Sequence, residues 1–296
     1  NPSMNHKKQS ELKGVEDFRM PPKSKKEKEE EKLSVDFFVL DDQTIALVMK
    51  HIGNAKGIVS LGRTCKRCYS EMNARWNDEV FEIFSRDYGL GPNATKWPGT
   101  STWFETLQKA KSQVSRIKKT LSNLRERNPD DYKDEYGVSF HKFRLQKPFS
   151  NSTLWRMERE ICALPMHLRL FLRRIGRSGA GPYCGIQDPG RWFWRGVSPK
   201  SPCRIDLKAC KTDEKNSWDG CLFIISQGCT YSSVIIVNGP DTGRIVNVND
   251  DTPEKVIPAP HANFLDYYED WCDKLLAPPK VKVGHKLYHT FWFGMK

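Results

Sequence analysis

The sequence predicts an α+β protein in which a helical N-terminal module and a connecting helix precede a sheet packed by helices. Apolar residues recur at helical spacing in three short stretches between residues 45 and 84. Between residues 219 and 250, by contrast, three short apolar runs are separated only by turn residues, which is typical of strands. Because these turns are short, the strands most simply form an antiparallel meander.

Residues 1–35 are predicted to be a disordered charged tail. The segment "KSKKEKEEEK" mixes both charges with almost no apolar residue. Such a segment cannot bury enough apolar surface to offset the entropy that ordering costs. We therefore expect folded structure to begin near residue 36.

Residues 36–90 are predicted to form three short helices, and residues 91–150 a connecting segment with one longer helix. The three apolar stripes are Ile45, Val48, Met49 and Ile52; Ile58, Leu61, Cys65 and Tyr69; and Trp76, Val80, Ile83 and Phe84. The longer helix has one basic face, and its apolar face consists of Leu107, Val114, Ile117, Leu121 and Leu124. Stripes of this kind fit any small helical bundle, so periodicity alone does not identify the module.

Residues 151–277 are predicted to form the sheet domain, which begins with two helices. Their apolar faces are Leu154, Met157 and Ile161, and then Leu168, Phe171, Leu172 and Ile175. Pro165 lies in the first turn of the second helix, where its missing N–H costs no hydrogen bond. The glycine-rich segment "GRSGAGPYCGI" then turns the chain toward the sheet.

The strands differ in the burial that their patterns predict. "DGCLFIIS" and "SSVIIVNG" are continuous apolar runs and should be buried on both faces, whereas "GRIVNVND" alternates and should expose Asn247 and Asn249 to water. Asn263 is the expected cap of a closing helix whose buried face includes Phe264, Trp271 and Leu275. Residues 278–296 form a tail that could add an edge strand.

The part of the chain from Leu154 to Leu276 resembles the SUKH superfamily, which includes fungal cell-wall regulators and bacterial toxin-immunity proteins. The resemblance rests on the serial order of "EREICALP", "LRLFLRRIG", "GAGPYCGI", "DGCLFIISQGCTYSSVIIVNG", "TGRIVNVND" and "FLDYYEDW". It implies a binding module without chemistry of its own, in which a sheet packed by helices presents one face to a protein ligand.

The N-terminal helices resemble an F-box, the motif that docks a Skp-type adaptor of a cullin-based ubiquitin ligase. "VLDDQTIALVMKHIGNAKGIVSLGRTCKRCYSEMNARWNDEVFEIFSRDYG" carries the likeness, and "WPGTSTWFETLQKA" resembles the Trp-containing stretch that often follows this motif. The family usually has proline after its opening leucine, where this chain has Asp41. The residues that the resemblance implies for adaptor binding are Leu40, Ile45, Val48, Met49, Ile52, Ile58, Leu61, Cys65 and Trp76.

An aromatic segment, "GRWFWRG", is the predicted target-binding surface. Three large side chains in a row cannot all face one core from a strand, and protein interfaces concentrate tryptophan and arginine. The expected target-binding residues are Tyr183, Trp192, Trp194 and Arg195. The alternative is that two of the three aromatic side chains are buried and one covers the sheet edge.

The formal net charge of +12 limits the classes of partner. The charged tail is nearly balanced, so the excess comes from the connecting helix and from later residues such as Arg173, Arg174 and Arg191. These cations could bind phosphate backbones, but no familiar nucleic-acid module is recognisable. The charge therefore favours an acidic protein partner, with nucleic acid as the remote alternative.

The nine cysteines do not have the spacing of a metal site or a disulfide framework. Cys65 and Cys68 form one CxxC within an expected helix, without a second ligand pair. Cys229 and His261 could be imagined as a catalytic pair, but Cys229 lies in an expected turn and no third group would orient the pair. We expect no catalytic residue, no metal, no cofactor and reduced thiols.

Together these patterns predict a non-catalytic substrate receptor of a cullin-type ubiquitin ligase. A Skp-type adaptor would bind the N-terminal module, and the sheet domain would bind an unidentified target protein. The alternative is a SUKH-type binding or signalling scaffold without a ubiquitin role. No apolar run approaches the ~20 residues of a membrane helix, so we expect a protein of the cytoplasm, the nucleus or both that has no membrane partner.

Overall fold

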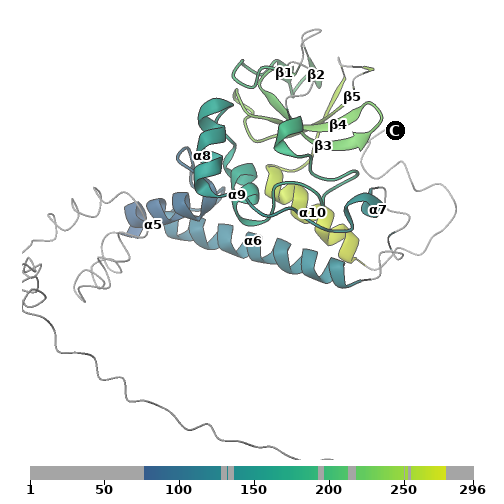
Figure 1. Cartoon of the computed structure of the whole chain (residues 1–296). Helices are drawn as coiled ribbons and strands as arrows, with labels where there is room; N and C mark the ends of the chain where they lie inside the picture. Colours follow the sequence, from purple (N-terminus) through teal and green to yellow (C-terminus); the bar gives the residue numbers. More distant parts are fainter. Residues whose placement is uncertain are drawn as a thin grey trace, which may run out of the picture.

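The structure is a computed structural model in which helices and antiparallel strands build one packed unit (Figure 1). It describes residues 77–127, 132, 137–192, 197–212, 218–249, 251–252 and 255–277. The predicted tail, the first two helices of the N-terminal module and the C-terminal tail all lie outside these residues. Helices and antiparallel sheet together make the described part an α+β structure.

The helices and strands are distributed along the chain much as predicted. The helical elements are α5 (Asn77–Ser85), the π-helical turn η2 (Arg86–Leu90), α6 (Trp103–Glu126), α7 (Val138–His141), α8 (Asn151–Glu160), α9 (Met166–Arg174), the 3-10 turn η4 (Pro189–Arg191) and α10 (Phe264–Leu276). The strands are β1 (Ile205–Asp206), β2 (Lys211–Thr212), β3 (Cys221–Gly228), β4 (Tyr231–Ile236), β5 (Ile245–Asn249) and β6 (Val256–Pro258). Pro165 is the N-cap of α9, directly before the turn in which we expected it.

The main sheet is the predicted antiparallel meander with one additional strand. Its order is β3-β4-β5-β6, and Val234 of β4 pairs with Phe223 on one side and with Val246 on the other. β3 and β4 are buried on both faces, as their continuous apolar runs predicted. β1 and β2 form a separate two-stranded hairpin.

Two apolar cores lie on opposite faces of this sheet. Leu222 and Ile224 of β3 join the larger core, which also contains α6, α9 and α10. Cys221 and Phe223 alternate with them and join a smaller core with Ile205 of the β1–β2 hairpin. Figure 1 shows the helices on one side of the sheet and this hairpin on the other.

α6 is the predicted connecting helix, and its predicted apolar face is buried. It begins at a capping box, in which the Thr102 side chain accepts the Glu105 N–H and the Glu105 carboxylate accepts the Thr102 N–H. Leu107, Val114, Ile117, Leu121 and Leu124 are all buried. The helix lies beneath α9 and α10 in Figure 1, and an ion pair at 2.6 Å joins Arg116 to Glu269 of α10.

α10 has the predicted cap and the predicted buried face. The Asn263 side chain accepts the Asp266 N–H at 3.0 Å, and Phe264, Trp271 and Leu275 are buried.

The predicted wet face of β5 is wrong for Asn247, which is only 6% exposed. α10 covers this face of the strand, so the Asn247 side chain is hydrogen-bonded within the protein. Its Oδ1 accepts from Gln227 at 2.7 Å and from Ser233 at 2.9 Å. The Ser233 hydroxyl also lies 3.4 Å from the hydroxyl of Tyr267 on α10. The alternating pattern correctly predicted that one side of β5 is polar. It did not predict that this side is buried, because polar side chains are also found inside a protein where hydrogen bonds satisfy them.

We predict that Asn247→Ala destabilises the fold. The substitution leaves Gln227 and Ser233 with buried donors that have lost their acceptor, which costs ~1–3 kcal/mol. Asn249→Ala is the control, because within the described residues its side chain accepts an exposed N–H, that of Asp251; it should cost less than ~0.5 kcal/mol. Urea unfolding measures both, and an equal loss in the two variants would contradict the role given to the buried network.

Candidate functional site

The predicted adaptor-binding residues lie outside the part of the chain that the structure describes. They are Leu40, Ile45, Val48, Met49, Ile52, Ile58, Leu61, Cys65 and Trp76. The first described element, α5, begins one residue after Trp76 and contains Ile83 and Phe84 of the third predicted stripe. The structure therefore describes where the N-terminal module joins the rest of the chain.

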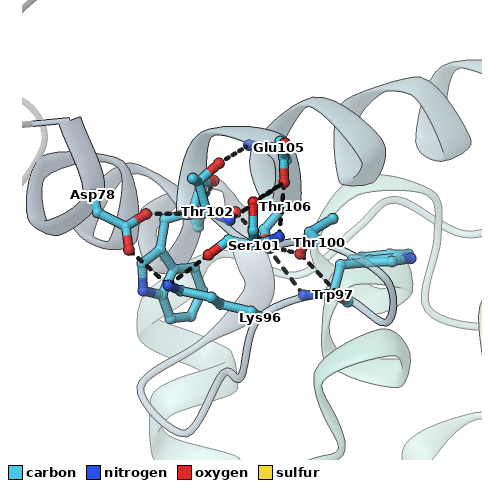
Figure 2. Close-up of polar contacts among 10 residues, drawn as sticks. Asp78, Lys96, Trp97, Thr100, Ser101, Thr102, Glu105 and Thr106 are labelled. Carbon is cyan, nitrogen blue, oxygen red and sulfur yellow. Dashed lines mark hydrogen bonds and ion pairs between the residues drawn. The ribbon is translucent and has the colours of Figure 1, made fainter.

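That junction is a corner between α5 and α6 that polar contacts hold together (Figure 2). The Asp78 carboxylate of α5 accepts the Trp103 N–H at the start of α6 and forms an ion pair with Lys96 at 2.7 Å. The Thr106 hydroxyl accepts the Trp97 N–H at 3.0 Å. The Asp78 bond satisfies a backbone N–H in the first turn of α6 that has no partner within the helix, and the Thr106 bond ties the preceding loop to that turn. Trp97 and Trp103 are both buried, so the Trp-containing stretch is a structural part of the corner.

An aromatic cluster lies on the outside of the corner. The Phe81 ring packs edge-to-face against Phe104, with centroids 4.9 Å apart, and lies 6.0 Å from the Phe84 ring. Phe104 remains 44% exposed. The cluster continues the third predicted stripe across to α6.

Arg169 fastens η2 to the sheet domain. Its Nε donates to Glu158 of α8 at 2.9 Å, and its Nη1 donates to the Gly89 carbonyl oxygen at 2.9 Å. The residue is only 3% exposed, and burial raises the pKa of the Glu158 carboxyl although Arg169 acts in the opposite direction. Gly91, at φ +91°, passes so close that a Cβ there would lie 2.4 Å from the Arg169 Cδ.

One partly buried histidine, His167, lies in the same packed region. The His167 ring at the start of α9 packs edge-to-face against Trp97, with centroids 4.4 Å apart. Burial lowers the pKa of His167 to about 4, with Asp266 acting weakly in the other direction. The imidazole is therefore neutral at physiological pH and belongs to the packing of the corner.

Four cations form what we call the basic surface, namely Lys111 and Lys118 of α6 with Arg173 and Arg174 of α9. The Arg174 guanidinium lies 4.0 Å from the centre of the Tyr88 ring, and the Lys111 ammonium lies 5.9 Å from it. Burial lowers the pKa of Lys118, and Arg174 adds to the effect. Burial likewise lowers the pKa of Arg174, and Arg173 contributes.

None of these four cations has a carboxylate at ion-pair distance among the residues that the structure describes. Besides burial, repulsion from Arg174 lowers the pKa of Lys118, and repulsion from Arg173 lowers the pKa of Arg174. An anion placed between them would relieve that repulsion. The basic surface therefore suits an acidic ligand.

The structure describes two of the four predicted target-binding residues, Tyr183 and Trp192, and neither is fully exposed. Trp192 is fully buried, and its indole N–H donates to the Gln187 carbonyl oxygen at 3.1 Å. It belongs to the larger core, so its assignment as an exposed binding residue is corrected. Tyr183 is half-buried, and burial raises the pKa of its hydroxyl. Trp194 and Arg195 lie outside the described residues.

Sequence patterns did not single out the basic surface as a site. Arg173 and Arg174 were named only among many basic residues that could bind phosphate or an acidic protein, and Tyr88 was not named at all. Arg174 and Tyr88 are far apart along the chain, and neither belongs to a motif. Only the packing of η2 against α9 brings them together.

The described residues contain no group of three or more histidine, cysteine or acidic side chains that could hold a metal ion. His261 lies against Asp270, with its Nε2 3.1 Å from Oδ2. Cys229 is exposed in the turn between β3 and β4. The geometry thus supplies a carboxylate contact for His261 but nothing that joins it to Cys229.

Comparison with protein-family models, with curated proteins and with solved structures found no match for the chain. Among the described helices, none is both long enough and apolar enough to cross a bilayer.

We predict that Arg169→Met strongly destabilises the protein. The change leaves the Glu158 carboxylate buried without its partner, and breaking a buried ion pair in this way costs ~3–5 kcal/mol. Arg156→Met on the exposed side of α8 is the matched control and should cost less than ~0.5 kcal/mol. Urea unfolding of both variants tests this, and a loss below ~1 kcal/mol in Arg169→Met would remove its anchoring role.

Proposed function

We propose that the chain is a non-catalytic substrate receptor of a cullin-type ubiquitin ligase. In this proposal the F-box-like module of residues 36–90 binds a Skp-type adaptor, and the SUKH-like domain of residues 151–277 binds the protein to be ubiquitinated. The family resemblances of the two segments are the starting point, and the packing between them supports their joint use. The protein would act in the cytoplasm, the nucleus or both.

The observation that carries the proposal is the continuous attachment of α5 to the sheet domain. A receptor has to hold its target at a set position relative to the adaptor, because transfer depends on proximity and orientation. Asp78 and Trp103 join α5 to α6, and Arg116 joins α6 to α10. Arg169 independently joins η2 to α8 and α9. These contacts connect α5 to the sheet domain. A movement of α5 relative to that domain would have to break them.

The basic surface supports a protein target with acidic segments. Exposed cations mainly raise the association rate and exclude partners of the wrong charge, whereas affinity comes from a few buried contacts. We therefore assign Lys111 and Lys118 to the steering of an acidic target. Trp194 and Arg195 remain the proposed residues of tight contact.

Two alternatives give different results in the same experiments. A SUKH-type scaffold without a ubiquitin role would use the sheet domain but would not bind an adaptor. A nucleic-acid-binding protein would use the four cations of the basic surface as phosphate contacts, so its affinity would fall steeply with salt.

We predict that replacing Ile45 and Val48 by aspartate abolishes adaptor binding while the melting temperature stays unchanged. These residues belong to the apolar stripe that would be buried only against the adaptor, and a charge in an apolar interface is not tolerated. The matched control is Lys50→Asp, which changes charge in the same segment outside the stripe. Pull-down of a Skp-type adaptor by the full chain measures binding. If the double variant unfolds, the stripe is part of a core and the scaffold alternative is favoured.

We predict that Trp194→Ala and Arg195→Ala each weaken target binding tenfold or more, which corresponds to ~1.4 kcal/mol. Lys118→Ala should act less strongly and mainly on the association rate, with Lys119→Ala as a control on the same helix. The target is first obtained by affinity purification with the full chain, and calorimetry and binding kinetics at two salt concentrations then test the variants. A larger loss for Lys118→Ala, together with binding that salt erases, would favour a nucleic acid or an acidic tail as the ligand.

A further inference from the structure

Cys203 and Cys221 form a close thiol pair at the edge of the smaller core. Their Sγ atoms lie 3.7 Å apart. A disulfide bond is ~2.05 Å long, so small side-chain rotations would bring the two sulfurs to bonding distance. Cys221 is the first residue of β3 and is fully buried, whereas Cys203 is partly exposed.

The backbone holds the two cysteines side by side. The Cys203 N–H donates to the Asn238 carbonyl oxygen at 2.9 Å. Gly220, directly before Cys221, has φ +71°, and a Cβ on it would lie 2.5 Å from the Cys203 nitrogen. Because only glycine permits so close an approach, the backbone of Cys203 can pass directly beside the start of β3. The Gly220 carbonyl oxygen in turn accepts the Val237 N–H at 2.7 Å.

The two thiols have different acidities. The hydrogen bond with Cys221 lowers the pKa of Cys203, and the Ile205 N–H contributes to the lowering. The same hydrogen bond raises the pKa of Cys221, and burial adds to the rise. Cys203 therefore becomes a thiolate more readily than Cys221, and the thiolate is the form that attacks a disulfide. Cys203 is also the more exposed of the two cysteines.

We propose that Cys203 and Cys221 are a redox-modification site that closes into an intramolecular disulfide by exchange with a small disulfide such as oxidised glutathione. The Cys203 thiolate attacks one glutathione sulfur and displaces the other glutathione as its thiolate. Cys221 then loses its proton and attacks the Cys203 sulfur, which releases the second glutathione. Two protein thiols are oxidised, and one glutathione disulfide is reduced to two molecules of reduced glutathione.

The bond would link one face of the sheet to the segment that packs over it, which we call the sheet cover. The segment that contains Cys203 and the β1–β2 hairpin places Val197, Ile205 and Leu207 against the smaller core. A Cys203–Cys221 disulfide closes the loop between this cover and β3, which restricts the unfolded chain and stabilises the folded one. The proposal does not rest on the receptor function, because it is argued from the geometry of Cys203 and Cys221 alone.

Equilibration of the full chain with buffers of defined reduced and oxidised glutathione tests the site. Free thiols are alkylated after quenching, and mass spectrometry identifies the bridged peptides. We expect a single Cys203–Cys221 bridge whose population follows the glutathione ratio. Cys203→Ser and Cys221→Ala should each remove it, whereas Cys210→Ser, which changes an exposed cysteine in the same segment, should retain it. A stable mixed disulfide of Cys203 with glutathione, or full alkylation of both cysteines at the oxidising limit, overturns the proposal.

A thermal measurement tests the effect on the sheet cover. The oxidised wild-type chain should melt higher than the reduced chain by about 5 °C or more, given the length of the closed loop. Oxidation should not change the melting temperature of Cys203→Ser, which keeps Cys221 and therefore the packing of β3. A bridge that forms without raising the melting temperature would refute the fastening role.

Discussion

The buried guanidinium of Arg169 is the constraint on which the arrangement of this protein depends. A charge removed from water has to be paired and hydrogen-bonded, and both acceptors here come from other elements. Glu158 neutralises the charge from α8, and the Gly89 carbonyl oxygen satisfies a second N–H from η2. α8, α9 and the chain that leads to α6 are therefore held at one point. Any movement of the N-terminal segment away from the sheet domain would remove the Gly89 acceptor and leave this buried guanidinium with Glu158 alone.

The same requirement for satisfied polar groups separates the interior of the protein from its proposed binding surface. Inside, Gln227, Ser233 and Asn247 hydrogen-bond to one another beneath α10. On the outside, Lys111 and Arg174 lie against Tyr88 and Lys118 lies near Arg174, with no carboxylate at ion-pair distance among the described residues. Water can solvate exposed cations, so the fold tolerates their repulsion. That repulsion is what an acidic partner would relieve, and it connects the packing of η2 to the proposed recognition of a target.

The candidate site could be predicted from the sequence only where it depends on local pattern. The resemblance to an F-box points to a stripe of residues before Trp76, and those residues lie outside the described structure. The choice of Trp192 as an exposed contact was wrong, because the sequence around it does not indicate which aromatic side chain faces the core. Its indole is buried with its N–H bonded to Gln187. The pairing of Cys203 with Cys221 likewise has no sequence signature.

By itself, the sequence determined the α+β class, the antiparallel meander, the buried face of α6 and the capped helix α10. These features follow from the spacing of apolar residues and from caps, which act over a few residues and can be recognised in one dimension. Only the tertiary structure decided that Asn247 is buried, that Arg169 receives its second acceptor from η2 and that Tyr88 lies under Arg174. Each of these depends on which elements cover one another, and that packing is set by contacts between residues far apart in the chain.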